Sequence, residues 1–152
     1  MKKFNLKNVF VFVFFFLIYI VPYFFIQRDL EFYNSLTKVN IPSFVFIVVW
    51  TVIYTLMSLY LMGIYKKISL KDKRLIAYLV INYLANICYV LFFFQFKLLF
   101  WSFIWCVVSF LSILFVWMET ILFNKKLSYL LIVNVLWSLF ACFLSGYVYL
   151  FN

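Results

Sequence analysis

The sequence has little charge, little glycine and proline, and no histidine. Of its 152 residues, 11% are charged, two are Gly, two are Pro and none is His. Soluble domains carry about 25% charged residues, so this chain has too few polar side chains to cover a water-soluble globule. The same composition argues against a disordered chain, a nucleic-acid-binding domain and a disulfide scaffold. Because His is absent and the three Cys have no metal-ligand spacing, we expect no metal site and no Cys–His catalytic site.

What the sequence does contain is long apolar runs. Hydrophobic residues make up 70% of the chain and aromatic residues 26%. Charges divide it into five runs, each near the length of about 20 residues that a membrane-spanning helix needs, and none alternates as a β-barrel strand would. We therefore predict an all-α integral membrane protein, a single domain over 1–152 that forms a five-transmembrane-helix bundle. The predicted helices cover 8–26, 42–65, 75–96, 98–118 and 127–151.

The net charge of +9 comes from basic residues between the runs. Such residues contact anionic lipid headgroups and orient a membrane protein, so we expect a bilayer and not a nucleic acid as the partner. Arg28, Lys38 and Lys97 would lie on one side of a five-helix bundle and the others on the opposite side. These others are Lys2, Lys3, Lys7, Lys66, Lys67, Lys71, Lys73, Arg74, Lys125 and Lys126. This asymmetry predicts a cytoplasmic N-terminus and an outer C-terminus, and the composition favours a bacterial plasma membrane.

Two connections are informative. The third, at Gln95–Lys97, is so short that the helices on either side of it should form a tight antiparallel hairpin. The first, over 27–41, is the longest and is a candidate lid on the outer face.

Uncharged polar and aromatic residues recur at helical spacing in three of the runs. Amides in lipid need partners, so these faces should point into the bundle. The spacing leaves two interpretations open: contacts that hold helices together, or an aromatic pocket with a few polar groups for a flat apolar ligand. The faces are Phe46, Trp50, Tyr54, Met57 and Ser58; Asn82, Asn86, Tyr89 and Phe93; and Asn134, Trp137, Ser138, Ala141 and Ser145. In 98–118, a stripe of Ser102, Trp105, Ser109 and Ser112 indicates close helix packing, because small hydroxyl residues let helices approach each other.

The second predicted helix also carries a recognisable motif. It keeps six residues of the stretch P-x-W-x-F-x-x-V-W-x-x-L-Y-x-x-M-G, namely Pro42, Phe46, Val49, Trp50, Tyr54 and Met57. Phe44 replaces its first Trp and Ser58 its Gly. This stretch resembles the second helix of the TspO/MBR family of tryptophan-rich sensory and translocator proteins.

Further stretches are similar to that family in the same order. The third predicted helix matches at Asn86, Phe93 and Phe94, while Asn82 and Tyr89 replace a Gln and a Trp. The fifth matches at Trp137, Phe140, Ala141 and Leu144, while Val133-Asn134 replaces Pro-Tyr. The approach to the second helix is similar at Tyr33, Leu36 and Lys38.

The resemblance implies a five-helix bundle, often dimeric, with a pocket on the first-loop side that binds porphyrins and similar flat ligands. It carries over Tyr33, Trp50, Asn86, Trp137 and Ala141, to which the helix faces add Tyr54, Tyr89 and Phe93. We expect protoporphyrin IX or haem as a ligand and no intrinsic cofactor or catalytic residue.

Three functions are consistent with these residues. The first is a membrane receptor or transporter-like protein for tetrapyrroles. The second is light-dependent porphyrin degradation, with Trp50 and Trp137 as redox partners. The third is a non-catalytic membrane interaction subunit, whose aromatic faces only pack against partner helices.

Overall fold

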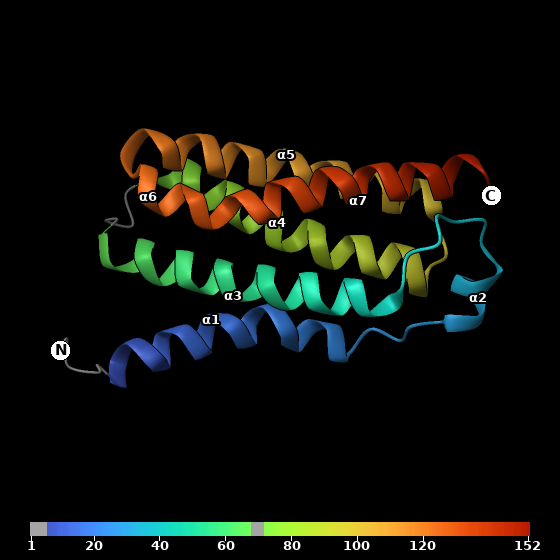
Figure 1. Cartoon of the computed structure of the whole chain (residues 1–152), viewed down its shortest axis with the longest axis horizontal. Coiled ribbons are helices and arrows are strands. Elements are labelled where there is room, and N and C mark those ends of the chain that lie inside the picture. Colours follow the sequence, from blue (N-terminus) through green and yellow to red (C-terminus); the bar gives the residue numbers. More distant parts are fainter. Residues whose placement is uncertain (1–5, 68–71) are drawn as a thin grey trace.

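The fold is a bundle of five long helices aligned with the long axis of the molecule (Figure 1). The computed structural model describes residues 6–67 and 72–152, and this part of the chain contains helices and no strand. The long helices are α1 (Leu6–Phe24), α3 (Ser43–Lys67), α4 (Lys73–Val90), α5 (Leu99–Phe123) and α7 (Ile132–Leu150). Five segments of the described residues are long and apolar enough to cross a bilayer. The prediction of an all-α, five-helix membrane protein is confirmed.

The helices pack as two connected groups. α4, α5 and α7 form one group, with α5 between the other two, and α1 packs on α3 as the second group (Figure 1). The groups meet where α3 contacts α7 and the short helices before it, α6 (Lys125–Ser128) and η2 (Tyr129–Leu131). The buried core between them consists of Tyr19, Ile53, Met57, Tyr60, Leu75, Ile113, Val116 and Leu131. Apolar side chains on the outer faces are exposed, as a protein surrounded by lipid requires.

The predicted hairpin between α4 and α5 is confirmed, and its turn has an unusual backbone. α4 continues into a π-helical turn, η1 (Leu91–Gln95), and the Leu98 N–H donates to the Phe92 carbonyl at 2.8 Å. Lys97 has a φ of 56°, a left-handed conformation that non-glycine residues seldom adopt. The chain thereby reverses within the three residues between η1 and α5.

The first loop contains a short helix, α2 (Leu30–Ser35), that the sequence did not predict. Asp29 caps it, accepting a hydrogen bond from the Phe32 N–H at 2.8 Å. Two contacts hold the loop over the bundle. Lys97 Nζ lies 2.7 Å from Asp29 Oδ2, and the Asn152 amide makes two bonds to the Thr37 backbone, at 2.8 and 3.0 Å. The loop therefore covers the same end of the bundle as the α4–α5 turn and the C-terminal residue (Figure 1).

Asn82 connects α4 to α5. Its side chain is 1% exposed, and Nδ2 donates to the Ser109 carbonyl at 2.9 Å and lies 3.3 and 3.2 Å from the hydroxyls of Ser109 and Ser112. The prediction that the serine stripe packs helices together is confirmed, because Ser102, Ser109 and Ser112 are all buried.

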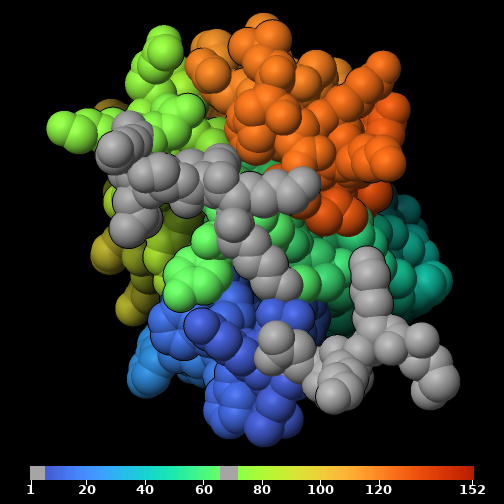
Figure 2. Space-filling view, turned by 90° about the vertical axis from the view of Figure 1, so that its left-hand side faces the viewer, coloured from blue at the N-terminus to red at the C-terminus, as the bar shows by residue number. Residues whose placement is uncertain are grey.

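The opposite end of the bundle is basic. There the starts of α1 and α4 and the segment around α6 come together (Figure 2). They carry the exposed side chains of Lys7, Lys73, Arg74, Lys125 and Lys126. Arg28, Lys38 and Lys97 lie at the loop end, as predicted, while Lys2, Lys3 and Lys71 lie outside the described residues.

Replacing Asn82 should weaken the bundle. Asn82→Ala removes the amide that joins α4 to α5 and leaves the Ser109 carbonyl without this donor. We expect the free energy of unfolding, measured by titration with a denaturing detergent, to fall by about 1–2 kcal/mol. The matched control is Asn34→Ala on α2, where the side chain is exposed. Equal stability changes in the two variants would contradict the role of Asn82.

Candidate ligand site at the loop end

Three of the eight predicted site residues meet beneath α2. The Tyr33 ring lies 6.3 Å from that of Phe93 in η1, and Phe93 lies 6.0 Å from Tyr89 near the end of α4. Phe94 extends this group, with its ring 4.9 Å from Phe93 and 6.1 Å from Tyr33. Lys38 fixes Tyr33 from above, since its Nζ donates to the Tyr33 carbonyl at 2.7 Å and lies 4.4 Å from the ring centroid. This set, Tyr33, Tyr89, Phe93 and Phe94, is the α2–α4 ring group.

A second group lies between α1 and α3. The rings of Trp50 and Tyr54, both predicted, are 5.4 Å apart. Tyr54 also stacks on Tyr19 and Tyr23 of α1, at 5.6 and 6.0 Å. Sequence analysis gave α1 no part in the site. The four-residue spacing of Tyr19 and Tyr23 was the available signal, because it places both rings on one face.

Trp137 forms a third group on α7. Its ring lies 5.8 Å from Phe46 of α3, one helical turn before Trp50, and 5.6 Å from Phe140. Its indole Nε1 is buried and has no hydrogen-bond partner among the described residues, and neither has the buried hydroxyl of Ser145 on the same helix. An unpaired buried donor costs about 1–3 kcal/mol. A ligand with an acceptor atom at Trp137 would remove that cost. Ala141, the last predicted residue on α7, lies one turn further on and is half-buried.

Asn86 differs from Asn82 in how its amide is used. Its Nδ2 donates to the Asn82 carbonyl of its own helix at 2.8 Å, and its side chain is half-buried. Within 6–67 and 72–152, no donor contacts the Asn86 side-chain oxygen at a hydrogen-bonding distance. Asn82 therefore holds two helices together, whereas the Asn86 amide bonds only within its own helix and its oxygen has no donor among the described residues.

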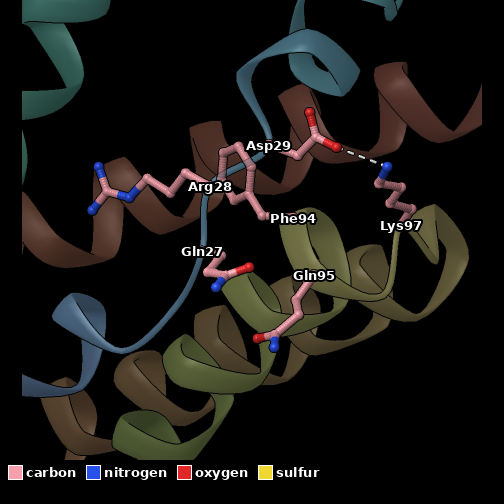
Figure 3. A pocket seen from close by; sticks show the side chains of 6 residues that line it. All are labelled: Gln27, Arg28, Asp29, Phe94, Gln95 and Lys97. Atoms are coloured by element: carbon pink, nitrogen blue, oxygen red, sulfur yellow. Dashed lines mark ion pairs between the residues drawn. The ribbon is translucent and has the colours of Figure 1, made fainter.

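The loop end also has a polar hollow that the sequence did not predict (Figure 3). Its volume is about 320 Å³, and it is lined by Gln27, Arg28, Asp29, Phe94, Gln95 and Lys97. None of the eight predicted residues lines it, but Phe94 belongs both to it and to the α2–α4 ring group. Its polar residues come from the first and third connections, which the predicted topology puts on one side of the membrane.

The ion pair at this hollow is electrostatically well defined. The hydrogen bond from Lys97, followed by that from the Phe32 N–H, holds the pKa of the Asp29 carboxyl below its ordinary value of 3.8. Partial burial has the opposite effect on the Tyr33 hydroxyl, whose pKa it raises. Asp29 is therefore a carboxylate at neutral pH, and Tyr33 is a neutral hydroxyl.

Together these features define a five-helix membrane protein with aromatic groups and a polar hollow at its loop end. Comparison with known proteins agrees with this class. Residues 9–150 match the TspO/MBR family. The tryptophan-rich protein TspO of Bacillus cereus is 29% identical over 126 residues, which are 82% of each chain. The membrane protein YtaB of Bacillus subtilis, described as uncharacterized, is 32% identical over 120 residues, 77% of each chain. The chain belongs to the TspO/MBR family.

The order of the first loop should depend on the charge of Asp29. The pKa of Asp29 is lower in the folded loop than its ordinary value, so the Asp29 carboxylate stabilises the folded loop. This stabilisation is complete above the ordinary pKa of Asp29. It is lost as the pH falls through the lowered pKa of the folded loop. We expect the Phe32 amide to be protected from hydrogen exchange near neutral pH and to lose protection below about pH 4, after correction for the intrinsic exchange rate. In Asp29→Asn, which keeps a capping oxygen without a charge, protection should not vary with pH. A wild-type profile that stays flat through the acid range would contradict this account.

Proposed function

We propose that this protein is a membrane receptor or transporter-like protein that binds porphyrins or similarly flat, hydrophobic ligands. The observation that carries the proposal is the family relationship over residues 9–150, since the resemblance to the TspO/MBR family is what implies a tetrapyrrole ligand. The geometry of the loop end supports it. The chemistry required is binding and orientation, for which aromatic walls with a few polar groups are the usual composition.

In this proposal, aromatic rings stack on the ligand and two polar atoms orient it. Trp50 and Tyr54 form one aromatic pair, and Tyr33 and Tyr89 lie against the ring of Phe93, which is itself buried. Such faces stack favourably on a flat conjugated ligand. The Trp137 indole N–H and the Asn86 side-chain oxygen supply one donor and one acceptor to orient it.

The proposed location is a bacterial plasma membrane. By the positive-inside rule, the basic end that carries Lys7, Lys73, Arg74, Lys125 and Lys126 faces the cytoplasm. The loop end and its ligand site then face outward. A homodimer within the bilayer, which the family resemblance implies, is part of the same proposal, and crosslinking in native membranes tests it.

Light-dependent porphyrin degradation is a second candidate function. The observation that favours it is the contact of Trp50 with Tyr54, and of Tyr54 with Tyr19 and Tyr23, which places oxidisable rings 5.4 to 6.0 Å apart. A photoexcited porphyrin beside Trp50 would have an electron donor next to it. Porphyrin loss under light that is unchanged in Trp50→Phe and Trp137→Phe would argue against this function.

Binding should be measurable through the five tryptophans. We expect saturable quenching when protoporphyrin IX is titrated in the dark into the detergent-purified protein. Trp137→Phe and Asn86→Ala should each weaken binding by about three- to tenfold, the loss expected for one hydrogen bond. The matched control is Trp117→Phe, which also removes one fluorophore and one buried, unpaired indole N–H, on α5.

Two results would contradict the proposal. Quenching that only follows partitioning of porphyrin into detergent, and is identical in all variants, would mean that the chain keeps the family fold without this ligand. Normal porphyrin affinity in Asn86→Ala, with loss of stability or of complex assembly, would favour the interaction subunit instead.

A further inference from the structure

The hollow at the loop end differs chemically from the aromatic groups beside it. Phe94 is its one aromatic residue, and the other five lining residues are charged or carry an amide. Its volume of about 320 Å³ is at the lower limit of small-molecule sites, which span roughly 300–1,000 Å³. It could therefore hold a polar group at the edge of a large flat ligand, but not the whole ligand.

One of the two cationic side chains that line the hollow has no anionic partner there. Asp29 is engaged by Lys97 Nζ at 2.7 Å and by the Phe32 N–H at 2.8 Å. Lys97 is neutralised by this pair and also lies 5.3 Å from the centre of the Phe32 ring. Arg28 is exposed and makes no hydrogen bond or ion pair within the part of the chain that the structure describes. The hollow thus has a net charge of +1, which comes from the Arg28 guanidinium.

The position of Arg28 suits an incoming anion. Its side chain points away from the Asp29–Lys97 pair (Figure 3), and Gln27 and Gln95 line the same hollow with side-chain amides. A guanidinium presents a planar set of donors that matches a carboxylate in a bidentate geometry. The two side-chain amides supply further donors within the same small volume.

The backbone around the hollow is held in an uncommon conformation. Gln95 ends the π-helical turn, and Lys97 has a left-handed φ of 56°. π-helical turns are often found at functional sites, and strained residues persist where surrounding contacts enforce them. Here the ion pair to Asp29 and the cap of α2 provide those contacts. The Asp29–Lys97 pair therefore joins the two walls of the hollow before a ligand arrives.

We propose that this hollow is a carboxylate subsite, in which Arg28, aided by Gln27 and Gln95, binds the acidic side chain of a flat aromatic ligand whose ring system lies against Tyr33 and Phe94, the half-buried rings of the α2–α4 ring group beside the hollow. Phe94 connects the two parts, because it lines the hollow and its ring is 4.9 Å from Phe93 and 6.1 Å from Tyr33. The subsite rests on the proposed function and narrows it to flat ligands that carry a carboxylate.

The test compares protoporphyrin IX, which has two carboxylic acids, with its uncharged dimethyl ester. Both are titrated in the dark in an uncharged detergent, and the ratio of their dissociation constants is taken for each protein. In wild type we expect the dissociation constant of the acid to be about tenfold lower than that of the ester, because one hydrogen bond to a charged group contributes about that much to binding. In Arg28→Gln this preference should disappear while the ester binds as in wild type. Arg74→Gln, the same exchange at an exposed residue of the opposite end, should keep the wild-type ratio.

Other results would separate the subsite from the function on which it rests. Porphyrin binding with the same acid-to-ester ratio in wild type and Arg28→Gln would overturn the subsite and leave the proposed function standing. Equal weakening of acid and ester in Arg28→Gln would show that Arg28 shapes the site without recognising charge, and would also overturn it. Loss of the preference when phosphatidylglycerol is added would assign the hollow to a lipid headgroup. If wild type bound neither compound saturably, the proposed function itself would fail.

Discussion

The hydrogen bonds of Asn82 to α5 are the interaction on which the loop end depends. In lipid, an amide has no water to bond, so a buried asparagine must find its partners on a neighbouring helix. Asn82 finds the Ser109 carbonyl at 2.9 Å, and the small serines of α5 let the two helices approach closely enough for this contact. This fixes how α4 lies on α5, and therefore where the turn between them emerges. Phe94, Gln95 and Lys97, which line the hollow, lie in this turn and in the π-helical turn before it.

The first loop is built onto this hairpin through few contacts. Asp29 both caps α2 and pairs with Lys97, and Asn152 bonds to Thr37 at the other end of the loop. Exposed ion pairs contribute little to stability, so this arrangement holds the loop in one position without making its opening costly.

Sequence reasoning succeeded where one periodic pattern determines the structure. Run length gave the five helices, and four-residue spacing gave the buried faces of Asn82, Ser138 and Ser145. It failed where a feature depends on residues far apart in the chain. The hollow joins 27–29 to 94–97, and no periodicity links these segments. The tyrosines of α1 were missed although their four-residue spacing places both rings on one face, because the rest of that run is apolar on every side. Helix α2, with six residues, is too short to leave a periodic signal.

Whether the predicted residues form a site depends on their surroundings more than on any single group. Trp117 and Trp137 both bury an indole N–H that has no partner in the described structure, so an unpaired indole alone does not identify a ligand contact. The two differ in what lies around them. Trp137 contacts Phe46, on the α3 face that continues to Trp50 and Tyr54, and shares its helix with the unpaired Ser145 hydroxyl. Both indoles pack against the same buried core, but within the described residues Trp117 has no aromatic ring partner of this kind. An unsatisfied donor beside aromatic faces is a place where a flat ligand gains both stacking and a hydrogen bond, whereas the same donor without aromatic neighbours offers the hydrogen bond alone.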